Sequence, residues 1–179
     1  MASLFRRFRV ALGMGEEPGQ AGTPAVRVRG LAYADLDAVL AIEASSFGSP
    51  WRRSTYSRIV GSTHHTFIVA ELGGETIAYA GFWVEGHQAH IAKVAVHADH
   101  RRRGIATLIL TDLLGRARRL GLTRAYLEVR RSNTVAQELY RRFGFHFERV
   151  QPRAYPNNGE DAFVLVRDDL LDIPPLTSR

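Results

Sequence analysis

One stretch of the chain, residues 97–106, combines residue types that suit phosphate binding. It has the sequence HADHRRRGIA and joins an apolar, strand-like run to the longest helical pattern of the chain. Gly104 would open that helix, whose N-terminus presents unpaired N–H groups and the positive end of the helix dipole. With Arg101, Arg102 and Arg103 beside it, this turn could bind a diphosphate. A solvated loop explains three arginines and a glycine equally well, so the rest of the chain must decide.

Glu128 is a candidate general base. It lies near the carboxyl end of an apolar strand predicted over residues 125–129, on which it faces the opposite side from Leu127 and Val129. The position is the carboxyl end of a strand beside the predicted diphosphate site, where open α/β sheets bind ligands. A partly desolvated carboxylate there could take a proton from a substrate. The alternative is a glutamate that only faces solvent.

Two polar side chains belong to the helix that follows. Tyr140 lies at the edge of an apolar stripe formed by Val135, Leu139 and Phe143, and its hydroxyl could protonate a leaving group. The alternative is core packing with the hydroxyl at the surface. Asn133 could cap this helix, bind a ligand amide, or do both.

Other kinds of active site find little support. The chain has no cysteine, which excludes a disulfide, a thiol nucleophile and a cysteine zinc site. The adjacent His64 and His65 diverge in extended chain, while His97 and His100 flank arginines that repel a cation, so we expect no metal site. Neither a Gly-x-Ser-x-Gly turn nor a Walker loop is present.

Composition describes one globular domain. The chain has 179 residues, of which 45% are hydrophobic and 23% charged, and no apolar run approaches the roughly 18 residues of a membrane span. The net charge of +6 suits an acidic partner. Because the arginine clusters fall on several elements without exposed aromatic residues between them, we expect no direct nucleic-acid binding. Lys93 is the only lysine among 24 basic residues.

Hydrophobic periodicity and turn residues predict a mixed sheet with helices. Asp35 could cap the first helix, and a Leu72-Gly73-Gly74-Glu75 hairpin joins the second and third strands. The strand, helix, strand run over 89–129 is a parallel crossover unit. The strands are predicted at 26–29, 66–71, 76–84, 89–96, 125–129, 145–150 and 162–167, with a loop over 152–161. The helices are predicted at 36–47, 51–60, between Gly104 and Gly121, and between Ser132 and Gly144.

These motifs resemble those of the GNAT acetyltransferases. The turn RRRGIA at 101–106 is similar to their acetyl-CoA loop, Arg/Gln-x-x-Gly-x-Gly/Ala. Further segments resemble the RimI-type N-acetyltransferases, which acetylate the N-terminal alanine of a small-subunit ribosomal protein: LEVR at 127–130, SN at 132–133, Ala136, LY at 139–140, GF at 144–145, Phe47 with PW at 50–51, and Arg153 and Tyr155 with EDA at 160–162.

The resemblance covers roughly residues 26 to 170 and implies the fold and domain plan. The fold class is α/β, a GNAT-like mixed, mostly antiparallel central sheet flanked by helices in a single domain over 26–170. Residues 1–25 are expected to be a flexible basic N-terminal tail and linker, and residues 171–179 a C-terminal tail.

The resemblance also implies roles for individual residues, with acetyl-CoA as cosubstrate and no metal. Glu128 would accept a proton and Tyr140 would donate one. Trp51 and Tyr155 would contact the acceptor substrate. Cofactor contacts would come from the pantetheine-lining Val94, Ala95 and Val96, from the diphosphate-binding Arg102, Arg103, Gly104, Ile105, Ala106 and Thr107, and from Asn133.

The implied acceptor is a protein N-terminus, most simply one beginning with alanine, such as that of a ribosomal protein. Ala154-Tyr155 replaces the Tyr-Tyr pair usual in the family, and Lys93 replaces a residue that is commonly small or polar beside the substrate cleft. The alternatives are other protein N-termini, lysine side chains or a small-molecule amine. A protein that binds acetyl-CoA without turnover is a further alternative. A cytoplasmic monomer or weak homodimer without membrane association is expected.

Overall fold

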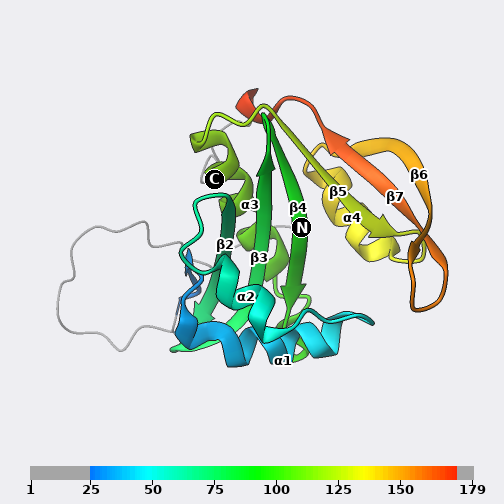
Figure 1. The fold of residues 1–179 in the computed structure, drawn as a ribbon. Coiled ribbons are helices and arrows are strands. Elements are labelled where there is room, and N and C mark those ends of the chain that lie inside the picture. Colours follow the sequence, from blue (N-terminus) through cyan, green and yellow to red (C-terminus); the bar gives the residue numbers. More distant parts are fainter. Residues whose placement is uncertain (1–24, 173–179) are drawn as a thin grey trace, which may run out of the picture.

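The computed structural model describes residues 25–172, whose strands form one seven-stranded sheet in the order β1-β2-β3-β4-β5-β7-β6 (Figure 1). Neighbouring strands are antiparallel except β4 and β5, which confirms the mixed, mostly antiparallel sheet. Nearly all of the two predicted tails lies outside the described residues. The strands are β1 Arg27–Gly30, β2 His65–Leu72, β3 Glu75–Glu85, β4 Gln88–Val96, β5 Arg124–Arg130, β6 His146–Tyr155 and β7 Glu160–Arg167.

Helices cover both faces of the sheet. In Figure 1, α1 (Leu36–Ser46) and α2 (Arg53–Ile59) lie in front of the first strands and α3 (Ile105–Arg119) lies behind them. The α3 side chains Ile109, Leu110, Leu113 and Leu114 are buried in the larger core cluster, to which Tyr140 of α4 (Thr134–Arg142) also belongs. A smaller cluster under α1 and α2 contains Leu36, Val39, Ile42, Tyr56 and Ile59. The single α/β domain therefore has one core on each face.

The strand β4 and its crossover helix follow the sequence pattern. Gly104 forms the N-cap of α3 with φ +78°, and Gly121, just beyond its end, has φ +76°. These left-handed conformations favour glycine because it has no Cβ. The crossover returns to β5, which pairs parallel with β4, as predicted.

The sheet opens between β4 and β5. In the described part of the chain these strands pair only at Gln88, Ala89 and His90, opposite Arg124, Ala125 and Tyr126, and then diverge (Figure 1). The register of β4 against β3 also shifts between Gly81 and Phe82, where Ala92 is passed over. Such a bulge bends a strand. From Ile91 to Val96, one backbone edge of β4 therefore has no strand partner on the β5 side.

The prediction that the Asp35 side chain caps α1 is wrong. Asp35 occupies the N-cap position, but its carboxylate has other partners. It accepts hydrogen bonds from Arg29, from the N–H of Ala32 and from Thr76, at 2.6 to 2.9 Å. No side-chain hydrogen bond caps α1. Asp35 therefore ties the first helix to strands β1 and β3.

The predicted stripe on α4 is only partly correct. Val135 is 67% exposed, whereas Leu139 and Phe143 pack against the core. Each step of four residues turns a helix about 40° past a full rotation, so three such positions fan out over about 80°. The fully packed position is Tyr140 instead.

The loop predicted over 152–161 is shorter in the structure. Strand β6 continues to Tyr155, which pairs with Glu160 at the start of β7, after an irregular register between Gln151 and Tyr155. Arg153 in this interval has φ +49°. This irregularity accommodates Pro152, which has no N–H to donate to a ladder, inside the strand.

Candidate functional site

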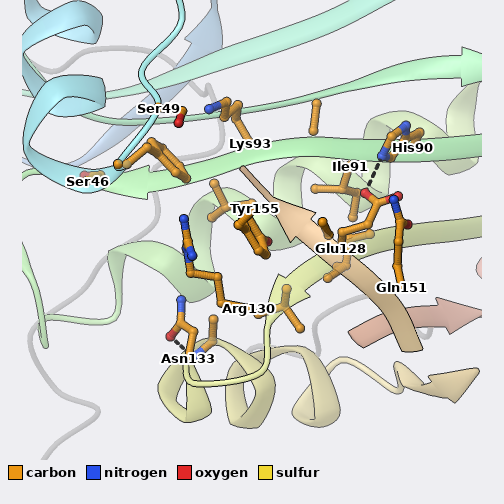
Figure 2. Close-up of a pocket in the computed structure, with 18 of the residues that line it drawn as sticks. Ser46, Ser49, His90, Ile91, Lys93, Glu128, Arg130, Asn133, Gln151 and Tyr155 are labelled. Carbon is orange, nitrogen blue, oxygen red and sulfur yellow. Dashed lines mark hydrogen bonds and ion pairs between the residues drawn. The ribbon is translucent and has the colours of Figure 1, made fainter. Parts of the chain in front are cut away.

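A pocket of about 470 Å³ lies where β4 and β5 part (Figure 2). Residues from β3, β4, β5, β6, α4 and the loops around the opening all line it, so it brings together side chains that are far apart in the sequence. The predicted site residues that line it are Trp51, Val94, Glu128, Asn133, Tyr140 and Tyr155. Lys93, Trp83, His90, Arg130 and Gln151 also line it.

Glu128 projects into the pocket from β5 and is held by a histidine. Its Oε2 lies 2.7 Å from Nε2 of His90, on β4. The carboxylate is 27% exposed. The indole N–H of Trp83 donates to Nδ1 of the same histidine at 3.0 Å, and the imidazole stacks on Tyr126 at 4.3 Å. A carboxylate with one oxygen engaged and a partly exposed side chain is placed to accept a proton from a bound amine.

Tyr140 lies on the α4 side of the pocket. Its ring is 8% exposed and packs edge-on against Phe145 at 5.8 Å. Burial, with a smaller contribution from Tyr155, raises the pKa of its hydroxyl. The phenol therefore keeps its proton at neutral pH and can serve as a donor.

A buried charge pair shapes the α1 side of the pocket. Lys93 Nζ lies 2.7 Å from Glu43 Oε1, and the same carboxylate accepts the N–H of Trp51 at 2.8 Å and the hydroxyls of Tyr56 and Tyr79. The ammonium also lies 4.5 Å from the centre of the Trp51 ring. Burial lowers the pKa of Lys93, and Glu43 opposes this effect. This cluster fixes the segment that carries Trp51.

A second ion pair lies where the β6–β7 turn meets the pocket. The guanidinium of Arg130 lies 3.8 Å from the centre of the Tyr155 ring and donates to Glu160 at 2.8 Å. Glu160 also accepts the N–H of Ser132 at 2.8 Å. Hydrogen bonds from Ser132 and Arg130 lower the pKa of Glu160 to about 2. The carboxylate is therefore ionised at neutral pH and ties the β6–β7 turn to the end of β5.

The predicted diphosphate turn lies outside the pocket, beyond the end of β4. Arg102, Arg103 and Gly104 are exposed, and the first helical hydrogen bond of α3 runs from Leu108 N–H to Gly104 C=O. The amides of the first turn are thus free of helical acceptors. Arg101, beside them, donates from Nε to Val96 C=O at 3.0 Å and from Nη2 to Ser46 Oγ at 3.2 Å.

The remaining predicted cofactor residues lie along β4 and at the start of α4. Val94 lines the pocket, whereas Ala95 belongs to the core under α1 and Val96 to the core under α3. Asn133 caps α4, since its side chain accepts the N–H of Ala136 at 3.1 Å, and it lines the pocket as well. Asn133 therefore caps α4, as predicted, and its position in the pocket wall also allows it to contact a ligand.

Four side chains of the site were missed from the sequence, namely His90, Trp83, Glu43 and Arg130. Two signals for the charged pair were available in the sequence. One is Glu43, which follows Ile42 in the first helix, and the other is Lys93, the only lysine of the chain. His90 lies in a β-branched run, where a polar side chain is unusual. No sequence pattern connects His90 with Glu128.

The described residues offer neither a metal site nor a membrane-spanning helix. Within residues 25–172, no group of three or more His, Cys, Asp or Glu side chains could hold a metal ion. Across the same residues, no helix has the length and apolarity needed to span a membrane.

Comparisons with known proteins agree with this geometry. A sequence model of the acetyltransferase (GNAT) family matches residues 36–145. A Bacillus subtilis protein named as a candidate ribosomal protein bS18-alanine N-acetyltransferase is 32% identical over 139 residues, which cover 77% of this chain and 92% of that protein. N-alpha-acetyltransferase RimI of Mycobacterium tuberculosis is 32% identical over 154 residues, 83% of this chain and 96% of that protein. The crystal structure of the ribosomal-protein-S18-alanine N-acetyltransferase from Escherichia coli superposes with a TM-score of 0.74 at 25% identity, covering 86% of this chain and 99% of that one.

Proposed function

The chain belongs to the GNAT acetyltransferase family, and we propose that it transfers the acetyl group of acetyl-CoA to the N-terminal α-amine of a protein. The observation that carries the proposal is the position of Glu128. This residue lines a pocket between two diverging strands, and Tyr140 lines the same pocket. A base and an acid around one cavity are what the transfer of an acetyl group to an amine requires.

The residues around the opening fit acetyl-CoA. The exposed N-terminus of α3, with Gly104 at φ +78° and Arg102 and Arg103 beside it, suits a diphosphate. The edge of β4 at Val94–Val96, which has no partner strand on the β5 side, offers backbone groups to an extended pantetheine arm. We assign these groups, the first-turn residues Ile105, Ala106 and Thr107, and Asn133 to cofactor binding. When bound, acetyl-CoA supplies an activated acetyl group as a thioester.

Glu128 is assigned as the proton acceptor. An α-amine has a pKa of about 7.7 to 8.0, so a mild base is sufficient to supply its neutral, nucleophilic form. Glu128, directly or through a water molecule, takes that proton. Negative charge that develops on the reacting carbonyl oxygen is stabilised by N–H donors on the free edge of β4.

Tyr140 is assigned as the proton donor to the departing thiolate. The hydroxyl is protonated at neutral pH, and although burial raises its pKa and so makes it a weaker acid, it can give that proton to the departing sulfur. No side chain of the enzyme has to act as a nucleophile, which is consistent with a chain that lacks cysteine.

The acceptor is proposed to be a protein N-terminus that begins with alanine. The names of the B. subtilis and E. coli proteins, both alanine N-acetyltransferases of a ribosomal protein, support this acceptor. Trp51 and Tyr155, which both line the pocket, are assigned to contact it. A ribosomal acceptor places the reaction in the cytoplasm.

The test is the release of CoA from acetyl-CoA with two peptides of identical sequence that begin with alanine. One has a free N-terminus and the other is Nα-acetylated, and a third, blocked peptide contains a lysine. We expect turnover with the free N-terminus alone. Equal rates with the blocked lysine peptide would refute the N-terminal acceptor. Tight acetyl-CoA binding without release of CoA to any amine would indicate a non-catalytic binding protein.

A further inference from the structure

His90 occupies a defined place at the opening of the sheet. It belongs to the last residue pair between β4 and β5, opposite Tyr126, beyond which the strands diverge. Its side chain is 20% exposed and lines the pocket (Figure 2). The Tyr126 ring stacks on the imidazole with an angle of 13° between the ring planes. Backbone pairing and stacking together fix the plane of the imidazole.

The two nitrogens of His90 have different nearest partners, Trp83 at Nδ1 and Glu128 at Nε2, and these two contacts favour one tautomer. The indole N–H of Trp83 is only a donor, so Nδ1, 3.0 Å away, must accept its hydrogen bond. The proton of the neutral imidazole therefore lies on Nε2, which donates to Glu128 Oε2 at 2.7 Å. The other carboxylate oxygen, Oε1, remains available for an amine in the pocket.

We infer that His90 is a positioning residue for Glu128: held by Trp83 and Tyr126, it aims one carboxylate oxygen of Glu128 at the acceptor amine. The inference deepens the proposed function and rests on it. It assigns the orientation of the base to a side chain of a different strand. Holding a reacting group in its productive geometry is a large part of what an active site contributes to rate.

The charges around His90 make its protonation a second control on the site. Glu128 of β5 and Glu85 of β3 face it, with Glu85 Oε1 3.4 Å from Nδ1, and the hydroxyl of Tyr126 donates to the same glutamate. Burial lowers the pKa of His90, but the two glutamates outweigh burial and raise it. A protonated Nδ1 would face the Trp83 N–H, donor to donor. Acidification therefore breaks the Trp83 contact and makes Glu128 a weaker base.

The first experiment compares two variants of His90. His90→Phe keeps a ring on Tyr126 and removes both hydrogen bonds, whereas His90→Gln keeps a donor near the position of Nε2. We expect His90→Phe to lower kcat by about 10- to 100-fold, the scale on which misplacing a reacting group slows enzymes, and His90→Gln to restore most of the loss. Acetyl-CoA affinity should be unchanged in both. His87→Phe, at an exposed position of the β3–β4 turn, is the matched control.

A double-variant cycle separates this inference from the proposed function. If His90 acts through Glu128, adding His90→Phe to Glu128→Gln costs no further activity. An equal loss in both backgrounds, or full activity of His90→Phe alone, overturns the role of His90 only. Full activity of Glu128→Gln instead overturns the assignment of the base under the proposed function.

A spectroscopic measurement keeps the inference testable even where a variant fails to fold or no peptide is acetylated. Imidazole 15N shifts of the wild-type protein should show His90 as the Nε2–H tautomer at pH values above its pKa. Trp83→Phe should raise that pKa, because Nδ1 loses its donor. A Nδ1–H tautomer in the wild-type protein would refute the hydrogen-bond chain.

Discussion

The Glu43–Lys93 pair lends itself to a quantitative test, because both groups are taken out of water. Glu43 is fully buried and Lys93 is 8% exposed. Removing one partner of such a pair leaves the other charge buried and uncompensated, at a cost of about 3 to 5 kcal/mol. For a domain of this size each kcal/mol lowers Tm by about 2 to 4 °C, so a single substitution should lower it by roughly 6 to 20 °C.

The structure also orders the variants. Glu43→Gln leaves the Lys93 ammonium buried without a counter-charge, and its amide NH₂ replaces one of the two oxygens that accept from Lys93, the Trp51 N–H and the two tyrosine hydroxyls. Lys93→Met keeps the length of the side chain and leaves the carboxylate with its neutral donors. We therefore expect Glu43→Gln to be the more destabilising substitution. The double variant should cost at least about 1 kcal/mol less than the sum of the two singles, since neither charge remains to be buried alone.

The assay is equilibrium urea denaturation with Tm as a second readout. The matched control is the exposed pair between Asp37, 89% exposed, and Arg53, 51% exposed. Asp37→Asn and Arg53→Met should each cost less than about 1 kcal/mol, as surface ion pairs do. The reasoning is refuted if Glu43→Gln and Lys93→Met cost no more than these controls, or if the costs of the buried pair add.

Three further predictions concern catalysis, cofactor binding and pH. Glu128→Gln should lower kcat by about 10² to 10⁴-fold while acetyl-CoA affinity, measured by calorimetry, stays close to wild type; a full-rate variant would remove Glu128 from the mechanism. Gly104→Glu should abolish acetyl-CoA binding in the same assay, because it adds bulk and negative charge at a left-handed position of the α3 N-terminus, and unchanged affinity would place the cofactor elsewhere. Although burial raises the pKa of Asp35, hydrogen bonds from Arg29, the Ala32 N–H and Thr76 lower it overall, so its stabilisation is present above the unfolded pKa of about 3.9 and disappears as pH falls below it. The free energy of unfolding of Asp35→Asn should therefore converge with that of the wild type as pH decreases, and a constant difference would contradict this origin.

Local patterns in the sequence were sufficient for most of the fold. Period-two and helical spacings, together with Gly73, Gly74, Gly104 and Gly121, located the strands, the hairpin and the crossover, because the residues that make these features are neighbours in the chain. The patterns were less reliable where a polar side chain could form hydrogen bonds either locally or with a distant part of the chain. The Asp35 carboxylate, for example, accepts hydrogen bonds from Arg29 of β1 and does not cap α1.

The site was predictable in its parts and not in its connections. Glu128 and Tyr140 were found from strand and helix positions, and both line one pocket. The hydrogen bond from His90 to Glu128 joins residues 38 positions apart, and the pair of Lys93 with Glu43 joins residues 50 apart. Such contacts depend on sheet register and on the β4 bulge, which the periodicity of a single strand does not contain.

The divergence of β4 and β5 creates two kinds of binding surface, one made of backbone groups and one made of side chains. Along the free edge of β4 the groups on offer are peptide units, which are chemically the same whatever side chain each residue carries. A ligand bound there responds to the path of the strand, so most substitutions that keep β4 extended should leave its affinity intact. The proposed acceptor would instead meet individual side chains that line the pocket, among them Trp51 and Tyr155. Under this proposal, single substitutions can change the acceptor preference while the donor remains the same.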